Sequence, residues 1–288
     1  MKYSITLASF RKIEPIEETL SKLEGQGYDA VEMFGEPQDV DVAKLRGIFS
    51  AYHIPVCGIT GMWGRAGKDG WKRKLLTSDQ SLVAASKKYV QDCIKMCNSL
   101  GGEVMNICLF ADEMPGFDRT HNMLAQSEKE QLTRKAVPIL AELCRYAADH
   151  GVKLVLEPLN RYSTPYCSTA KDAAEIVRQV SNDSLGILLD TFHMNIEEDS
   201  FESAIQHAGP LLKHTHFADN NRKMPGSAHI NFSAIMGCLQ EIGYNGYVSF
   251  EPNIEDKNYE HATRTGLDFV KGKANSFDQQ HEWWSQQP

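Results

Sequence analysis

The sequence has 288 residues, of which 42% are hydrophobic and 24% are charged, and a formal net charge of −8 at pH 7. These proportions are typical of a globular protein and exclude a disordered chain or a fibre. No stretch approaches the ~18 consecutive apolar residues of a membrane span, and the negative charge disfavours a nucleic-acid partner because it repels phosphate backbones.

Short apolar runs typical of strands alternate along the chain with longer stretches of helical periodicity. We predict eight strands, at Tyr3–Phe10, Tyr28–Met33, Ile54–Ile59, Glu103–Leu109, Lys153–Glu157, Leu185–Asp190, Leu211–Phe217 and Gly246–Glu251. Most of these runs show little alternation, which indicates strands buried on both faces. We predict eight helices, at Pro15–Gly25, Val42–His53, Ser81–Leu100, Glu128–His150, Thr169–Val180, Phe201–Ala208, Phe232–Ile242 and Tyr259–Lys271.

This alternation favours a single (β/α)8 barrel, the TIM barrel of the α/β class. The alternative is a doubly wound open sheet with a second domain. After the first strand, however, Ala8-Ser9-Phe10-Arg11 stands where a Gly-rich dinucleotide-binding turn would be. No Pro/Gly/Ser-rich linker divides the chain either. We therefore expect residues 1–288 to form one barrel domain, with a C-terminal tail from about residue 273.

Two connections in this pattern are long, Thr60–Asp79 and Phe110–Ser127. Both follow strands, so both should lie at the C-terminal face of the barrel, where barrel enzymes build their active sites. Long loops at that face often act as lids, and the alternative is a solvated insertion without a role.

Cysteine usage bears on the cellular compartment. The seven cysteines, an odd number, are scattered from Cys57 to Cys238 and do not resemble a disulfide framework, which indicates a reducing environment. The N-terminal stretch also lacks the apolar run and cleavage site of a signal peptide. We expect a cytoplasmic protein.

Four consecutive predicted strands end on side chains that can bind a metal ion: Glu157, Asp190, His216 and Glu251. They are 33, 26 and 35 residues apart, the lengths of single βα units. A parallel barrel would place all four at about one height around one mouth. Each acid could instead cap its strand or pair with an arginine, but four such residues in consecutive units favour a shared site.

The chemistry of this set indicates a divalent cation. Three carboxylates that face one another repel and raise each other's pKa values, and a cation removes that repulsion. Three carboxylates and one imidazole suit Mn²⁺ or Co²⁺, with Mg²⁺ or Zn²⁺ as further candidates. His214 points to the same side of its strand as His216. It could be a second ligand, but we favour a deeper position from which it orients the site.

Other polar residues follow the same strands. His193 and Arg222 are placed to hydrogen-bond a polyol, with a loop salt bridge as the competing interpretation. Glu197 and Glu198 are expected near the start of the next helix, where the helix dipole favours acids.

Four stretches of the second half of the chain, LEPLNRY, LDTFHMNIEED, HTHFADNNRKMPGS and SFEP, resemble the D-tagatose 3-epimerase family with its D-psicose and L-ribulose relatives. This family belongs to the sugar isomerase/epimerase (xylose isomerase-like) barrel superfamily. The resemblance implies that Glu157, Asp190, His216 and Glu251 bind a divalent ion, most readily Mn²⁺. It also implies that Glu157 and Glu251 act as the catalytic bases, and that His193 and Arg222 bind the substrate.

Two positions depart from that family's pattern. The epimerases usually read Asn-Arg-x-Glu after strand five, where this chain has Ser163, and a glycine is usual at Ala228. The missing carboxylate weakens the case for a simple free ketohexose, and the same stretches also look like those of barrel enzymes that act on 3-keto-glycosides.

We therefore expect a metal-dependent isomerase that epimerises keto sugars, inverting a carbon next to the carbonyl through an enediolate. The alternatives are an epimerase or lyase acting on 3-keto-glycosides and an aldose–ketose isomerase. A DNA repair enzyme similar to endonuclease IV is more remote, because it would need a multi-zinc cluster and a basic groove. The expected partners are a small-molecule sugar and further copies of the chain, in a dimer or tetramer.

Overall fold

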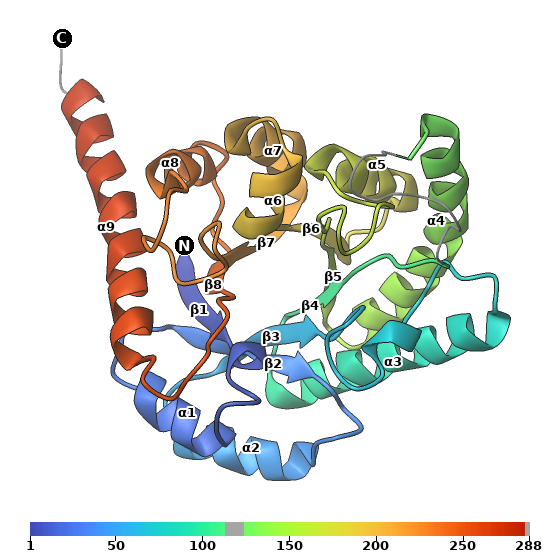
Figure 1. Cartoon of the computed structure of the whole chain (residues 1–288), viewed down its shortest axis with the longest axis horizontal. Helices are drawn as coiled ribbons and strands as arrows, with labels where there is room; N and C mark the ends of the chain where they lie inside the picture. Colours follow the sequence, from blue (N-terminus) through green and yellow to red (C-terminus); the bar gives the residue numbers. More distant parts are fainter. Residues whose placement is uncertain (113–123, 286–288) are drawn as a thin grey trace.

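The computed structural model describes residues 1–112 and 124–285, and side chains as far as residue 274. Its centre is a closed barrel of eight parallel strands in chain order, in which β8 pairs with β1 (Figure 1). The strands are β1 Lys2–Thr6, β2 Ala30–Gly35, β3 Val56–Gly61, β4 Val104–Ile107, β5 Lys153–Leu156, β6 Leu185–Asp190, β7 Leu212–Phe217 and β8 Tyr247–Phe250. The predicted (β/α)8 barrel is confirmed.

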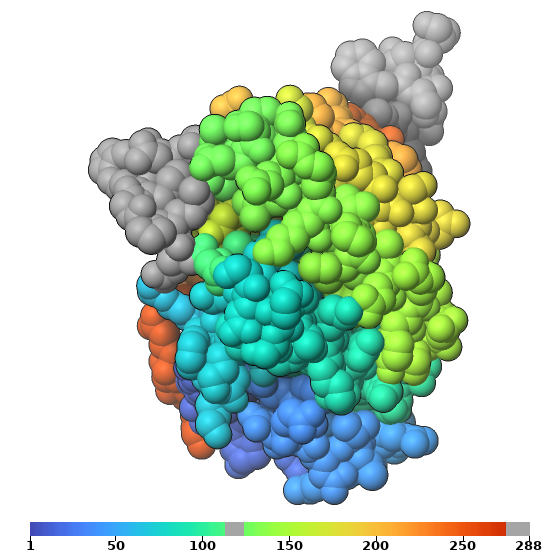
Figure 2. Space-filling view, turned by 90° about the vertical axis from the view of Figure 1, so that its right-hand side faces the viewer, coloured from blue at the N-terminus to red at the C-terminus, as the bar shows by residue number. Residues whose placement is uncertain are grey.

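The helices surround this barrel on the outside. They are α1 Ile16–Leu23, α2 Val42–Ala51, α3 Gln80–Leu100, α4 Gln126–Asp149, α5 Ala170–Val180, α6 Thr191–Glu197, α7 Phe201–Ala208, α8 Phe232–Glu241 and α9 Glu260–Ser285. Figure 2 shows one outer face, where α2, α3 and α4 follow one another from blue to green and pack side by side. The barrel strands are thus covered, which explains why their sequences read as continuous apolar runs.

Helix starts follow local capping chemistry. The side chains of Asp41, Asp79 and Thr169 accept hydrogen bonds from the first free backbone N–H groups of α2, α3 and α5, which is the usual role of Asp and Thr at this position. Gly101 ends α3 in the left-handed region, with a φ of 82°, which costs a glycine little. These caps define where the helices begin and end, and so where the adjoining strands begin and end.

One helix differs from the prediction. No helix is predicted between the sixth strand and Phe201, but residues Thr191–Glu197 form α6, so the described residues contain nine α-helices rather than eight. The carboxylate of Asp190 accepts a hydrogen bond from Phe192 N at 2.7 Å and so caps α6. A strand that ends on a good N-cap residue can pass directly into a helix.

The position expected for Glu197 and Glu198 is therefore wrong. Glu197 is the last residue of α6, not part of the start of α7, and its buried carboxylate accepts hydrogen bonds from Arg161 N and Nε at 2.6 and 2.9 Å. Glu198 accepts a hydrogen bond from Ala170 N at 2.6 Å. It does lie against a helix N-terminus, as the dipole argument requires, but that helix is α5.

The two long connections and the C-terminal region differ in how much of them the structure describes. Thr60–Asp79 joins β3 to α3 and contains a short 3-10 helix at Gly70–Lys72. Of the second connection, Phe110–Ser127, residues 113–123 lie outside the described part of the chain. Residue 273, where we expected a tail to begin, lies within α9, which contacts α8 (Figure 1). Among the described residues no helix is long and apolar enough to cross a membrane.

Candidate active site and metal centre

The four strand-end residues come together at one mouth of the barrel. One ligand atom each from Glu157, Asp190, His216 and Glu251 can be chosen so that all four lie within 4.8 Å of one another. Asp190 and His216 end or lie within β6 and β7, while Glu157 and Glu251 directly follow β5 and β8. The first three are buried and Glu251 is half-buried. The closure of parallel strands in register thus produces the cluster that the spacing predicts.

His216 connects this cluster to the barrel interior. Its Nδ1 atom lies 3.1 Å from Glu251 Oε2 and 3.7 Å from Glu157 Oε1, yet this buried atom makes no hydrogen bond. Its Nε2 atom lies 3.2 Å from Glu32 Oε2. Because a carboxylate can only accept, Nε2 carries the hydrogen, and in the neutral ring Nδ1 then has a free lone pair that faces the carboxylates. This is the tautomer that a metal ligand requires.

Charges around the cluster shift its pKa values in different directions. Burial opposes the ionisation of Glu251, but Arg222 and His216 outweigh it and hold the pKa of Glu251 well below its ordinary value. Burial dominates at Asp190 and raises its pKa, although Arg222 partly counteracts this effect. Burial likewise opposes protonation of His216, but Glu251 and Glu32 raise its pKa well above the ordinary value. The carboxylates thus draw positive charge toward them, from Arg222 and from a proton on His216, and this is the charge that a bound cation would supply.

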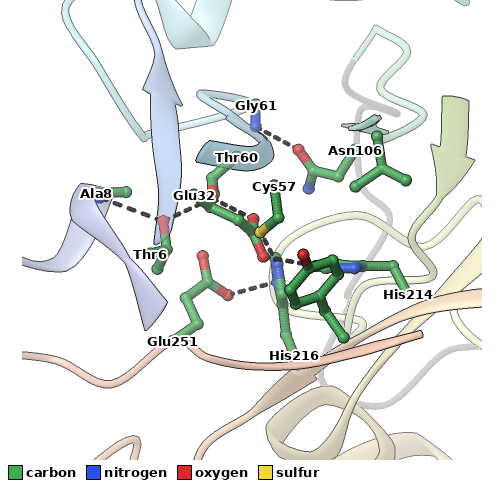
Figure 3. Close-up of polar contacts among 12 residues, drawn as sticks. Thr6, Ala8, Glu32, Cys57, Thr60, Gly61, Asn106, His214, His216 and Glu251 are labelled. Atoms are coloured by element: carbon green, nitrogen blue, oxygen red, sulfur yellow. Dashed lines mark hydrogen bonds and ion pairs between the residues drawn. The ribbon is translucent and has the colours of Figure 1, made fainter. Parts of the chain in front are cut away.

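The sequence reasoning missed Glu32, a fully buried acid in the middle of β2. Its Oε1 atom lies 2.5 Å from His214 Nε2, while Oε2 contacts His216 and accepts a hydrogen bond from Thr60 Oγ1 at 2.7 Å (Figure 3). Both histidines lower the pKa of Glu32 well below its ordinary value despite its burial. An acid at the centre of the apolar run AVEMFG was the available signal, since such an acid is costly unless it is paired.

Glu32 also settles the place of His214. This histidine forms a group with Glu32 and His216 and is not among the four side chains that meet at the mouth. Beyond Glu32, Thr60 Oγ1 lies 2.6 Å from Thr6 Oγ1, which accepts a hydrogen bond from Ala8 N. Since Thr60 donates to Glu32, it must accept from Thr6. A directed chain of hydrogen bonds (Figure 3) thus holds the acid that orients the His216 ring.

Asn106 of β4 is a second residue that the sequence reasoning missed. Its Nδ2 atom donates to Glu157 Oε2 at 2.5 Å, and its Oδ1 atom accepts a hydrogen bond from Gly61 N. Cys108 Sγ also lies 3.5 Å from Glu157 Oε2. With Oε2 held in this way, Oε1 of Glu157 faces the two histidines, His216 and His193.

His193 lies on α6 with its ring at the edge of the cluster. Its Nδ1 atom accepts a hydrogen bond from Asn160 N at 3.2 Å and lies 2.8 Å from Asn160 Nδ2. The hydrogen of the neutral ring is therefore on Nε2, which lies 3.9 Å from Glu157 Oε1. This arrangement leaves a hydrogen-bond donor beside the carboxylate.

Arg222 reaches the same cluster from the loop after β7. Its Nη1 atom lies 2.5 Å from Asp190 Oδ2 and its Nη2 atom contacts Glu251 Oε2, while its guanidinium lies 5.0 Å from the centre of the Phe192 ring. The competing interpretation, a loop salt bridge, thus describes Arg222 in this structure. The two carboxylates it pairs with are nevertheless those of the cluster.

The backbone of that loop is held in an unusual conformation. Arg222 has a φ of 59°, which is costly for a residue with a Cβ and occurs often at functional sites. The buried carboxylate of Asp219 accepts hydrogen bonds from the backbone N–H groups of Gly226, Ala228 and Ile230. Ala228 has no positive φ, so an alanine fits where the resembled family has glycine.

A cavity of about 690 Å³ opens over the cluster. Its lining includes Glu157, Glu251, His193 and Arg222, together with Asn106. A second cavity of about 480 Å³ lies on the side of β1 and shares Arg222 and Glu251 with the first. The size of the first cavity is in the range of ~300–1,000 Å³ typical of small-molecule sites.

The donor set fits a divalent cation. It offers three carboxylates and one imidazole nitrogen whose lone pair is free when the ring is neutral, and Glu32 and Asn106 orient this set. Oxygen-rich sets with one histidine suit Mn²⁺, Mg²⁺ and related ions, and the oriented histidine is typical of metal centres. The group of Glu32, His214 and His216 is already engaged in hydrogen bonds among its members.

Fold and site together define a TIM-barrel protein with a candidate metal centre at the C-terminal ends of its strands. Residues 20–273 match the family model described as xylose isomerase-like TIM barrel. The chain belongs to this family.

Curated relatives of the chain are sugar epimerases. It is 30% identical over 237 residues to the D-psicose 3-epimerase of Ruminiclostridium cellulolyticum, which covers 81% of this chain and 76% of the relative. It is 25% identical over 262 residues to the 3-dehydro-D-guloside 4-epimerase of Escherichia coli, covering 90% of this chain and 95% of the relative. The D-psicose 3-epimerase of Clostridium cellulolyticum, solved with D-tagatose, superposes with a TM-score of 0.80 at 25% identity, over 95% of this chain and 99% of that one.

Proposed function

We propose that this protein is a metal-dependent epimerase of keto sugars, which inverts a carbon next to the carbonyl through an enediolate. The observation that carries the proposal is that two carboxylates, Glu157 and Glu251, line one cavity together with a histidine and an arginine. The relatives support the substrate class, because they are named as epimerases of ketoses and of a keto-glycoside.

The mechanism follows from the two carboxylates. One of Glu157 and Glu251 removes the proton from the carbon next to the ketone, and the electron pair moves onto the sugar oxygens as an enediolate. The other, in its protonated form, returns a proton to the opposite face of that carbon, which inverts it. His193 Nε2 and the guanidinium of Arg222 hydrogen-bond the oxygens on which charge develops.

The metal ion is proposed to bind to Glu157, Asp190, His216 and Glu251. When bound, a divalent cation supplies electrostatic stabilisation of the negative charge on the sugar oxygens. We propose Mn²⁺ as the ion because three carboxylates dominate the set, with Co²⁺, Mg²⁺ and Zn²⁺ as the alternatives to test. Arg222 pairs with Asp190 and Glu251, and a bound cation would share their negative charge and so weaken its hold on Arg222.

The alternatives share the first step and differ in the product. An aldose–ketose isomerase would move the carbonyl between carbons 1 and 2, and a lyase acting on a 3-keto-glycoside would release the aglycone. A DNA repair enzyme would need a basic groove, whereas the chain carries a net charge of −8. Product analysis separates these activities.

The decisive experiment incubates Mn²⁺-loaded protein with ketohexoses, ketopentoses and 3-keto-glycosides in deuterated water. We expect an epimer that carries deuterium at the inverted carbon. Glu157→Gln and Glu251→Gln should each abolish turnover and leave the circular dichroism spectrum unchanged. The matched control is Glu14→Gln, since Glu14 is another buried acid but pairs with Lys22 at 2.7 Å outside the site. Epimerisation without solvent exchange would contradict the scheme, and failure to bind any divalent ion would contradict the metal dependence.

Two further expectations accompany this proposal. All seven cysteines are free and buried, which supports the reducing, cytoplasmic compartment that we propose. Assembly into a dimer or tetramer stays a prediction, and light scattering after size-exclusion chromatography measures it.

A further inference from the structure

Two aromatic side chains stand exposed at the cavity that contains the candidate catalytic acids. Trp71 is 61% exposed and Tyr162 is 58% exposed, and they are the exposed large hydrophobic side chains of the described residues. Both line the 690 Å³ cavity, as do Glu157 and Glu251. Scattered exposed apolar residues need no explanation, but two large ones that border the same site indicate a contact surface.

The backbone under Trp71 is held firmly. The neighbouring Arg73 donates to Met62 O at 2.6 Å and to Glu36 Oε2 at 2.6 Å, and its guanidinium lies 3.7 Å from the centre of the Tyr89 ring. Lys72 Nζ lies 5.1 Å from the centre of the Trp71 ring, which is otherwise largely exposed. The loop is thus anchored while the indole remains available.

The backbone at Tyr162 is also held by hydrogen bonds. Its backbone N–H donates to Asn160 Oδ1 at 3.0 Å, and the preceding Arg161 binds the buried carboxylate of Glu197. Asn160 also donates to His193 Nδ1. The backbone that carries the Tyr162 ring is therefore tied to a residue of the candidate site. Rigid aromatic side chains lose little conformational entropy on binding and are effective contact surfaces.

The polar residues of this part of the cavity can donate hydrogen bonds to the hydroxyl groups of a polyol or a glycoside. Ser163 stands beside Tyr162 in the lining, where the resembled family has a glutamate, and two cations, Arg65 and Lys74, line the same cavity. The acids of the described lining are Glu157 and Glu251 alone. The described lining therefore offers hydrogen-bond donors to the hydroxyl groups of a ligand. It lacks the carboxylate that would bind the end of a free ketose.

We propose that Trp71 and Tyr162 form a binding subsite for a second ring, so that the substrate is a keto sugar in glycosidic linkage and the aglycone ring packs on these aromatic faces. This inference rests on the proposed function and specifies its substrate class. A ring bound there extends from the carboxylates through one continuous cavity, whose volume suits ligands larger than a monosaccharide.

The second cavity provides an internal control for the proposed subsite. It is lined by Lys12 and other residues of the loop after β1, and it borders Arg222 and Glu251, as the first cavity does. Lys12 is exposed, and neither aromatic residue lines that cavity. Lys12→Ala therefore tests whether an aglycone occupies the second cavity instead.

The experiment measures binding separately from turnover. Two compounds with the same reacting ring, methyl 3-ketoglucoside and 3-ketotrehalose, are titrated by calorimetry into metal-free protein of otherwise wild-type sequence, which under the proposed metal dependence should not turn them over. We expect 3-ketotrehalose to bind at least tenfold more tightly. In the same background, Trp71→Ala or Tyr162→Ala should bring the affinity ratio close to one, whereas Tyr162→Phe and Lys12→Ala should keep it, because the phenylalanine retains the ring face.

Each result is decisive for the subsite. Equal affinities, no binding of either compound, or loss of the preference in Lys12→Ala would overturn it. A change of oligomeric state in Trp71→Ala and Tyr162→Ala, with the preference retained, would show that the aromatic residues belong to a subunit interface. Deuterium incorporation by the wild-type protein tests the proposed function independently. Turnover of free ketoses without a glycoside preference would refute the subsite alone, and a glycoside preference without proton exchange would refute the epimerase alone.

Discussion

The carboxylate of Glu32 offers the sharpest test of how the candidate metal centre is organised. In Glu32→Gln the amide keeps the volume of the carboxylate but removes its charge, and its NH2 group cannot accept from a histidine. Glu32 binds His214 at 2.5 Å and His216 at 3.2 Å, and of these only His216 faces the candidate ligands. The single amide oxygen then replaces two carboxylate oxygens that served one histidine each, so the constraint on the His216 tautomer is weakened.

The magnitude follows from the role of such partners. Loss of an outer partner of a metal-binding histidine weakens metal affinity about 10- to 100-fold, which corresponds to about 1.4–2.8 kcal/mol of binding free energy. The folded state should also lose about 1–3 kcal/mol, because buried donors on both histidines lose a charged acceptor. Calorimetric titration with Mn²⁺ measures the first effect, and urea unfolding of the metal-free protein measures the second.

The matched control is Glu36→Gln. Glu36 follows the same strand and is also buried, but it pairs with Arg73 at 2.6 Å and is not part of either candidate metal group. It should lose stability and keep wild-type Mn²⁺ affinity. Wild-type Mn²⁺ affinity in Glu32→Gln, measured on protein shown to be folded, would refute the reasoning that Glu32 orients the His216 ring.

Three further predictions concern other parts of the chain. Hydrogen bonds from backbone and side chains lower the pKa of Asp112 to about 2. The stabilisation by its carboxylate should therefore be complete above the unfolded pKa of ~3.9 and be lost as the pH falls through about 2. The difference in Tm between wild type and Asp112→Asn should shrink over the same pH range. Arg161→Ala leaves the buried Glu197 carboxylate without its cation and should cost about 2 kcal/mol in urea unfolding. In Gly61→Ala the new Cβ would lie 2.7 Å from Asn106 Oδ1 and 2.8 Å from the Asn106 carbonyl oxygen. This close contact should lower the free energy of unfolding by about 1–3 kcal/mol and lower kcat. An unchanged Tm with full turnover would contradict this prediction.

The sequence was sufficient to predict the barrel and the meeting of four side chains, because both depend on periodicity and spacing. It placed strand ends less well. The first strand was expected to reach Phe10, but β1 ends at Thr6, whose side chain caps a 3-10 turn at Leu7–Ser9. The helix α6 begins directly after Asp190, which acts as its N-cap. We interpreted Asp190 from the sequence only as a candidate metal ligand and therefore missed this helix start.

The residues that hold the site were harder to foresee. Glu32 and Asn106 lie on β2 and β4, far in sequence from the side chains they orient. Spacing between strand ends carries no information about contacts across a barrel, since these depend on register and side-chain length. A charged or amide side chain within an otherwise apolar strand is the signal that would have marked both, because a buried polar group needs a partner.

The origin of the site residues has a thermodynamic consequence for the molecule as a whole. All four candidate ligands lie between residues 157 and 251, whereas Glu32, Thr60 and Asn106, which support them, come from the first half of the chain. An ion held by the second half in a geometry set by the first binds most tightly when the two halves are packed together. Binding would then stabilise the complete barrel over a partly open form, by up to about 2.7 kcal/mol at an ion concentration of 100 times Kd. The ion would therefore stabilise the folded barrel reversibly, in addition to its part in the chemistry.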